Sequence, residues 1–174
     1  ALKIVPNHGP SLLLGASIEY TQGNLQTAES YANKLLSAAP RNGVGIKMLA
    51  AIQLRQGRVE DAERTLSVID LEKTNDAGIQ AIAGQIALAK KDYKRATVNF
   101  ERAAQLAPNN AAVLADLGLT RLTQGESRGS LDLEAAAALA GEDVAVHSMV
   151  ILARLRGKEF DAALKAISEL ERSQ

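Results

Sequence analysis

The feature that most constrains this 174-residue sequence is a 34-residue period shared by three kinds of residue. Alanine recurs every 34 residues at Ala28, Ala62 and Ala96. Proline and glycine follow the same period, but each is missing from one repeat: Pro6, Pro40 and Pro108; Gly23, Gly57 and Gly125. A fixed period of this length indicates a repeat architecture, in which each repeat is one small unit that packs on its neighbours.

Each repeat is predicted to be a helical hairpin. Residues 43–57 carry apolar side chains at helical spacing and end in glycine, a common helix stop. Residues 59–71 show a second amphipathic pattern, with apolar residues three or four apart at Val59, Ala62, Leu66 and Ile69. An Asn or Asp stands before most first helices, where its side chain can cap free backbone N–H groups: Asn42, Asp76, Asn110 and Asp143.

The period divides the chain into five units, preceded by residues 1–8 as the tail of an earlier repeat. The units are 9–42, 43–76, 77–110, 111–143 and 144–174. The fourth is degenerate, because Ser130 stands where alanine is expected and Glu134 where an apolar residue is expected. The sequence thus predicts an all-α fold, a right-handed α-solenoid of about ten helices. It also indicates a fragment of a longer array.

Small residues recur where the two helices of a hairpin would cross. First helices carry Ala16, Ala50, Gly84 and Gly118, and second helices carry Ala28, Ala62 and Ala96. Antiparallel helices can approach closely only if small side chains meet at the crossing, so a larger residue there is expected to cost about 1–3 kcal/mol.

Composition and motifs argue against several classes of function. Basic and acidic residues balance at 20 each, which does not favour a nucleic-acid binder, and no apolar run is long enough to span a membrane. The chain lacks cysteine, and its histidines, His8 and His147, each stand alone. Gly43 and Gly45 lack the third glycine of a nucleotide fingerprint. We therefore expect no catalytic residues, no metal site and no cofactor.

The repeat resembles the tetratricopeptide repeat (TPR) family across the whole chain. Three units have a small residue at the eighth position and alanine at the twentieth, and the best single match is KKDYKRATVNFERAAQLAPNN. The aromatic residue usual at the eleventh position is replaced by Glu19, Gln53, Ala87 and Arg121. The isoleucines one residue earlier are expected to fill that space: Ile18, Ile52 and Ile86.

The phrases QLRQGRVEDAERTL and LARLRGKEFDAALKAISELERSQ are more narrowly similar to the TPR-repeat lipoprotein (PrsT type) of bacterial PEP-CTERM systems. Those systems pair protein sorting with exopolysaccharide production. This resemblance implies an exported parent protein, lipid-anchored in the bacterial envelope. A cytoplasmic TPR protein could have the same composition.

The TPR resemblance implies that fixed positions of the first helices line a groove that binds a partner protein, as a peptide or an amphipathic helix. We call these positions the groove residues: Leu13, Ser17, Tyr20, Lys47, Ala51, Leu54, Arg55, Ala81, Gln85, Leu88, Leu119 and Leu122. An alternative for Tyr20, Leu54, Leu88 and Leu122 is packing between repeats. The function expected is a non-catalytic interaction scaffold in envelope protein sorting or exopolysaccharide assembly.

Two other interpretations stay open. The chain could be the recognition arm of a larger enzyme, such as a glycosyltransferase. The ends of the array could also expose apolar surface and allow self-association.

Overall fold

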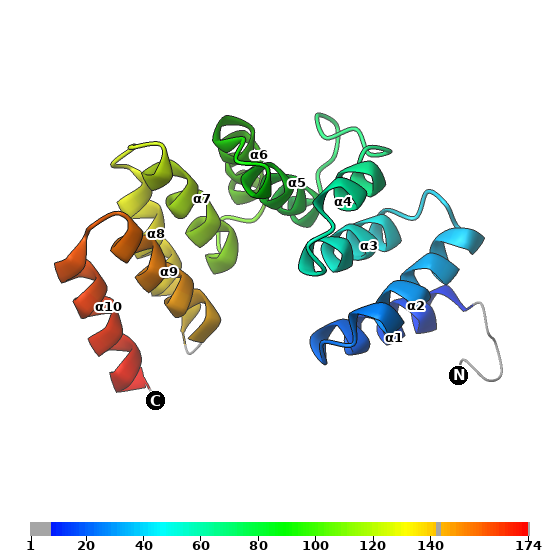
Figure 1. The fold of residues 1–174 in the computed structure, drawn as a ribbon, viewed down its shortest axis with the longest axis horizontal. Coiled ribbons are helices and arrows are strands. Elements are labelled where there is room, and N and C mark those ends of the chain that lie inside the picture. The colour runs from blue at the N-terminus through cyan, green and yellow to red at the C-terminus, as the bar shows by residue number, and fades with distance from the viewer. Residues whose placement is uncertain (1–7, 142–143, 174) are drawn as a thin grey trace. The chain divides into compact units, whose positions relative to one another are not determined.

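The structure is a computed structural model that describes residues 8–141 and 144–173. These residues form ten α-helices and no strand (Figure 1). The helices are α1 (Gly9–Thr21), α2 (Leu25–Ala38), α3 (Gly43–Arg55), α4 (Val59–Leu66), α5 (Ala77–Ala89), α6 (Tyr93–Leu106), α7 (Ala111–Thr123), α8 (Gly129–Ala140), α9 (Val144–Arg156) and α10 (Phe160–Ser173).

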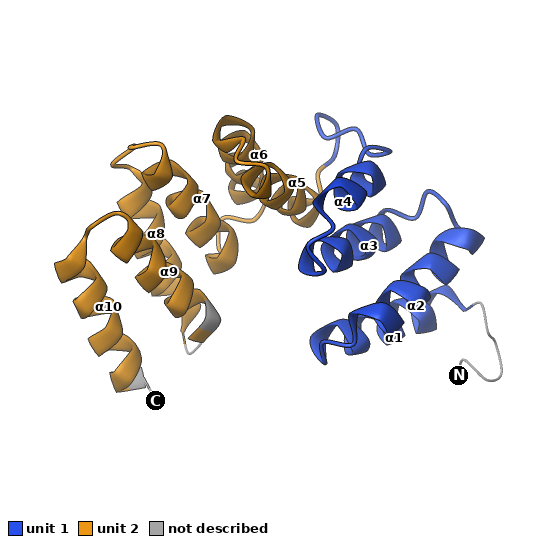
Figure 2. Ribbon diagram, in the orientation of Figure 1, with its two compact units in different colours: residues 1–74 blue, residues 75–174 orange. Residues whose placement is uncertain are grey.

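Consecutive helices pack in pairs as hairpins, α1 with α2 and so on to α9 with α10. The chain divides into two compact units, residues 1–74 and 75–174 (Figure 2). Unit 1 contains α1–α4, and unit 2 contains α5–α10. Within each unit the first helix of one hairpin also contacts the first helix of the next, as α1 contacts α3 and α7 contacts α9.

Side-chain caps fix the starts of three first helices, as the sequence predicts. The Asn42 side-chain oxygen accepts a hydrogen bond from Gly45 N at 2.8 Å. Asp76 accepts from the backbone N–H groups of residues 78 and 79, and Asn110 from that of residue 113. Each cap satisfies donors that have no partner within the helix. Asp143, the fourth predicted cap, lies outside the described residues.

The turns inside the hairpins need a left-handed backbone residue. Glycine supplies it in three hairpins, at Gly23, Gly57 and Gly125, with φ of 82°, 76° and 80°. The skipped place holds Lys91, which adopts the same conformation with φ of 61°. Lys158 does so in the last hairpin. The turn geometry is therefore retained even where the glycine is lost, at a conformational cost to the lysine.

The predicted small residues at the helix crossings are all buried. The closest approaches involve glycine. A Cβ atom built on Gly84 would lie 2.6 Å from the Phe100 ring, and one on Gly129 would lie 2.6 Å from the Gly118 carbonyl oxygen. Such distances are below any real carbon contact, so these helices could not pack as they do with alanine there.

The fourth hairpin corrects one prediction. Gly129, rather than Ser130, is the buried small residue of α8, and Leu133 is fully buried four residues later. Glu134 is exposed, as a residue on the outer side of this helix should be. The apolar pattern of the second helix is thus intact but shifted by one residue, because the turn before α8 takes up the difference in spacing.

Helix α4 is shorter than predicted. It ends at Leu66, and residues 67–74 form turns in place of the expected continuation to residue 71. The Asp70 side chain accepts a hydrogen bond from Glu72 N at 3.1 Å, and its carbonyl oxygen accepts from residues 73 and 74. Ser67, Val68 and Ile69 are weak helix formers, so these local bonds outweigh continuation of the helix.

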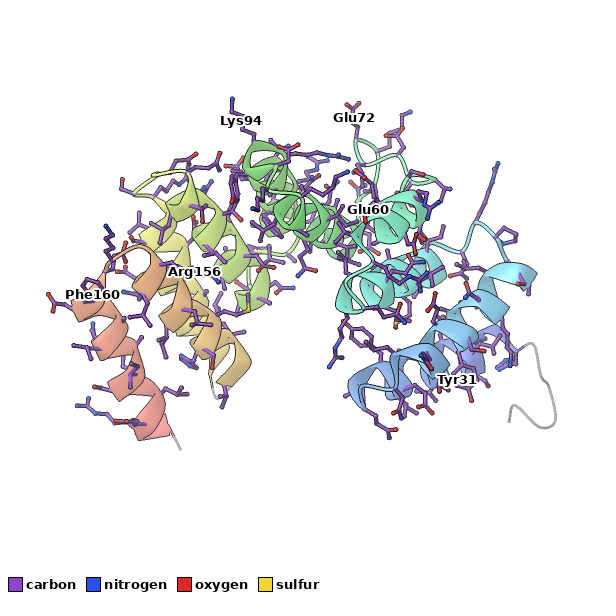
Figure 3. The ribbon with its side chains drawn as sticks, viewed as in Figure 1. Tyr31, Glu60, Glu72, Lys94, Arg156 and Phe160 are labelled. Atoms are coloured by element: carbon purple, nitrogen blue, oxygen red, sulfur yellow. The ribbon has the colours of Figure 1, made fainter. Side chains whose placement is uncertain are left out.

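Not every apolar side chain of the helices is buried. Ile18, expected to fill the space of the missing aromatic residue, is 47% exposed, whereas Ile52 and Ile86 are buried as predicted. Phe160, at the start of α10 (Figure 3), is 60% exposed, and Leu164 is exposed as well. Residues 1–7, most of the predicted tail of an earlier repeat, lie outside the described residues.

Candidate functional site

The groove residues all lie on first helices, as their positions in the repeat require. Unit 1 contains those of α1 and α3, and unit 2 those of α5 and α7. Arg55 and Gln85 are exposed, and the others are half-buried. Every groove residue therefore keeps some surface that a partner could contact.

In unit 1 the structure brings Tyr20 and Arg55 together. The Arg55 guanidinium lies 4.8 Å from the centroid of the Tyr20 ring, and its Nη1 donates a hydrogen bond to the Tyr20 carbonyl oxygen at 2.7 Å. Tyr20 also packs against the buried cluster of Ala28, Ala32, Leu49 and Ile52. The cation–π contact and the hydrogen bond together hold an exposed cation in one place.

In unit 2 several groove residues also pack on the core. Leu88 lies against the cluster that contains Phe100 and Leu117. Leu119 and Leu122 lie against a second cluster, which contains Leu133, Val146 and Val150. Leu88 and Leu122 stand at the same repeat position as Tyr20, so all three contact core clusters while remaining half-exposed. The packing interpretation thus accounts for part of each side chain.

Gln85 is held by a residue that the sequence analysis did not identify. Its Nε2 donates to Asp116 Oδ2 at 3.0 Å, across the contact between α5 and α7. Asp116 is only 6% exposed. Burial raises the pKa of its carboxyl group, and the hydrogen bond from Gln85 opposes that shift only in part. An acidic residue within the apolar run of residues 111–119 was the available signal.

The polar residues at the eleventh repeat position form a set of contacts that the sequence analysis also missed. In α3, the buried Gln53 accepts a hydrogen bond from Thr65 of α4 at 2.7 Å. In α7, the Arg121 side chain is 4% exposed and binds two carboxylates at 2.5 Å, Asp132 of α8 and Glu101 of α6. We call this group the Arg121 clamp.

Arg121 remains charged in its buried position. Burial works to lower the pKa of its guanidinium, but the hydrogen bonds to Asp132 and Glu101 outweigh it and raise the pKa above the ordinary value. Glu101 is half-buried in this clamp and is not a freely solvated residue of its helix. Lys94 on the same helix points away from the ribbon, as expected (Figure 3).

The two histidines have structural contacts. His8 bonds to the Ser11 hydroxyl at 2.8 Å before α1, and the buried His147 bonds to the Gly141 carbonyl oxygen at 2.9 Å. In the part of the chain that the structure describes, no group of three or more potential ligand side chains is placed to hold a metal ion. No helix within the described ranges is both long and apolar enough to cross a membrane.

Comparison with known protein families gives a match over part of the chain. Residues 19–86 match the tetratricopeptide repeat family. This match spans the last turn of α1 through most of α5, and it includes both Tyr20 and Arg55. No protein of curated function matches the sequence.

Solved structures of TPR proteins share the fold. A thermophilic TPR protein of Thermus thermophilus superposes with a TM-score of 0.82 at 18% identity, covering 95% of this chain and 91% of that one. MamA of Desulfovibrio magneticus RS-1 gives 0.68 at 19% identity, covering 95% and 96%. YrrB, described as a TPR protein with an unusual peptide-binding site, gives 0.64 at 11% identity, covering 100% and 90%. The likeness shows the fold, an all-α helical solenoid.

Proposed function

We propose that this chain is a TPR scaffold that binds a peptide or an amphipathic helix of a partner protein through the groove residues. The TPR fold in general suggests a protein-interaction scaffold, and the family match includes the part of unit 1 that carries Tyr20, Lys47 and Arg55. YrrB, a neighbour in fold, is described as having a peptide-binding site, which supports the same kind of partner.

The observation that carries the proposal is the contact between Tyr20 and Arg55. An exposed arginine is usually mobile in water and would lose conformational entropy on binding a partner. Here the ring of Tyr20 and its carbonyl oxygen already hold the guanidinium, so part of that cost is met before a partner arrives. The half-buried Ala51 and Leu54 lie on the same helix as Arg55 and offer apolar surface beside the cation.

The test is affinity capture from cell lysate with two baits, the natural chain and a groove variant that carries Tyr20→Ala, Leu54→Ala and Arg55→Glu. We expect partners to bind the natural chain and to be lost with the groove variant. A photo-reactive residue in place of Ala51 should cross-link to the same partners, which mass spectrometry would then identify.

Lys34→Glu is the matched control for the charge reversal. Lys34 of α2 lies 5.8 Å from the ring centroid of Tyr31 (Figure 3), so it is another cation beside a tyrosine in unit 1, but on a second helix. Its reversal should leave capture unchanged. Partners retained equally by the groove variant, with normal folding by circular dichroism, would place the binding surface elsewhere.

The resemblance to the PrsT-type lipoprotein adds a cellular role to the proposal. We place the scaffold in the bacterial envelope, exported as part of a lipid-anchored protein and acting in protein sorting or exopolysaccharide assembly. Fractionation of the source cells should then find the protein in the envelope. Recovery in the cytosol alone would contradict this role and leave the binding of a partner protein unaffected.

A further inference from the structure

Unit 2 contains a pocket that the groove residues do not line. It has a volume of about 510 Å³ and is formed by residues of α8 and α10 together with Arg154 of α9. Four alanines and four charged residues line it, and the charged ones are Glu134, Arg154, Lys165 and Glu169. Glu134, Lys165 and Glu169 are exposed, whereas Arg154 is 8% exposed.

Arg154 is buried, and its Nε has no hydrogen-bond partner among the described residues. Within the same described ranges, this is also true of the Nε of Arg121. Unlike Arg121, whose Nη atoms bind two carboxylates, Arg154 forms no ion pair in the part of the chain that the structure describes. Removing a guanidinium from water is costly unless carboxylates or other acceptors replace the lost hydration. A pocket beside such a group leaves room for an acceptor.

The Arg121 clamp shows what acceptor fits, because Arg154 occupies the same place one hairpin later. Each arginine stands four residues before the left-handed residue of its turn, Gly125 or Lys158. The turns are also bonded alike. Glu126 N donates to the carbonyl oxygen of Arg121, and Glu159 N donates to that of Arg154, both at 2.9 Å.

The repeat positions of the two carboxylates that bind Arg121 can be compared with the equivalent positions around Arg154. Glu101 of α6 follows the buried Ala96 by five residues, and Glu134 of α8 follows the buried Gly129 by five. The second helix of the preceding hairpin therefore carries a glutamate at the same position for both arginines. Asp132 follows Gly129 by three residues. The residue that follows Ala163 by three is Ala166, which lines the pocket. The second helix of the same hairpin therefore carries a carboxylate for Arg121, on α8, but only the methyl group of Ala166 for Arg154, on α10.

We propose that this α8–α10 pocket binds an Asp or Glu side chain of a partner protein, whose carboxylate takes the place that Asp132 fills beside Arg121. This deepens the proposed function, on which it rests, by giving the scaffold a second contact for an acidic segment. Lys165 lies at the rim, where its Nζ is 3.8 Å from Oε1 of Glu169, so these two charges largely offset each other. The exposed Glu134 and Glu169 are screened by water more strongly than the buried guanidinium, so the attraction at Arg154 dominates.

The test follows the Arg154 Nε–Hε resonance of the 174-residue chain by NMR, assigned with Arg154→Lys. The probe is an N-acetylated, C-amidated peptide, Gly-Ala-Glu-Ala-Gly, compared with the same peptide carrying Gln for Glu. We expect a saturable shift of this resonance with the Glu peptide and about tenfold or more weaker binding of the Gln peptide, since the Gln peptide lacks a charge-assisted hydrogen bond. A peptide whose only carboxylate is its C-terminus shows whether a chain end also fits.

Ala166→Asp is the decisive variant, because it rebuilds the clamp within the chain. It should abolish the peptide shift while leaving the fold intact. The groove variant described above should retain the shift, and capture of groove partners should survive Ala166→Asp, so the two proposals can fail separately. An Arg154 resonance that no peptide moves, or that moves equally in Ala166→Asp, would overturn the proposal. So would a resonance that responds only to Glu134→Gln, since Glu134 would then be the partner of Arg154.

Discussion

Single residues at one repeat position decide how the hairpins of this chain are joined. The eleventh position, where TPR proteins usually carry an aromatic residue, carries Gln53, Arg121 and Arg154, and all three are buried. An aromatic ring fills such a space by shape alone. A polar side chain there must also find hydrogen-bond partners on the helices around it. Gln53 finds Thr65, and Arg121 finds carboxylates on the helices to either side.

Buried charge of this kind serves geometry more than stability. The desolvation of Arg121 offsets much of the attraction to Glu101 and Asp132, so replacing the whole clamp with apolar residues need not weaken the fold. Removing only one carboxylate would leave a buried charge partly uncompensated. That constraint fixes how α6, α7 and α8 pack on one another.

Asp116 makes a prediction about pH. The pKa of its carboxyl group is raised by burial, so ionisation is penalised in the folded state. The penalty is absent below the unfolded pKa, where both states are protonated, and stability is lost as pH rises through the folded pKa. We expect Asp116→Asn to raise the melting temperature at pH 7, and the gain to vanish towards about pH 3, below the ordinary Asp range. The asparagine of this variant can still accept the hydrogen bond from Gln85.

Asp92→Asn is a suitable control for that melting series. Asp92 caps α6 by accepting from Arg95 N, and asparagine caps a helix equally well. Its melting temperature should follow that of the natural chain across the pH range. A lower melting temperature for Asp116→Asn at pH 7 would show that the ionised carboxylate stabilises the fold.

At the scale of helices, the crossings depend on glycine and alanine in the first helices, which let the second helices approach closely. Gly84 of α5 lies against the fully buried Phe100 of α6, and Gly118 of α7 meets Gly129 and Leu133 of α8. The two crossings differ in the atoms that an added Cβ would meet. At Gly84 the neighbour is a large ring with no free space, while at Gly118 it includes a backbone carbonyl.

Gly84→Ala should therefore destabilise the chain. Alanine normally stabilises a helix interior relative to glycine by roughly 1 kcal/mol, but the added Cβ would overlap the Phe100 ring. We expect a net loss of about 1–3 kcal/mol in the free energy of unfolding, measured by chemical denaturation. Gly43→Ala is the control, since a Cβ there meets no atom within 4 Å. If Gly84→Ala were as stable as that control, α5 and α6 would have room to move apart.

For the whole molecule, each unit has interior contacts of its own. Unit 1 contains the cluster of Ala28, Ala32, Leu49 and Ile52. Unit 2 contains the two clusters around Phe100 and Val150, together with the Arg121 clamp and the α8–α10 pocket. In repeat proteins, stability is close to a sum of the stabilities of hairpins and of the contacts between neighbours.

We expect residues 75–174 to fold without unit 1. That segment keeps Asp76, the cap of α5, and every hydrogen bond described for unit 2. It should give a helical circular dichroism spectrum and a cooperative thermal transition. Residues 94–174 form the comparison, because they lack α5 and leave Phe100 without its cover. A chain of residues 75–174 that is unfolded at room temperature would show that unit 1 is needed for its stability.

From the sequence alone we predicted the helices apart from the end of α4, the glycine turns, three caps that the structure confirms, and the crossing residues of the first three hairpins. These features depend on residues close in the chain, such as Asn42 three residues before Gly45, or on a spacing that repeats. The resemblance located the groove residues on the first helices, but whether they bind a partner stays a prediction.

The tertiary structure was needed to show how α8 is registered, what Arg121 and Asp116 bind, and that the Nε of Arg154 has no acceptor within the described part of the chain. Gly129 replaces Ser130 in the core because it is the residue that can approach Gly118. A lone arginine or aspartate in a helix looks the same in a sequence whether it is solvated or buried. Its state depends on the side chains that other helices bring to it: α6 and α8 bring carboxylates to Arg121, whereas α10 brings Ala166 to the pocket beside Arg154.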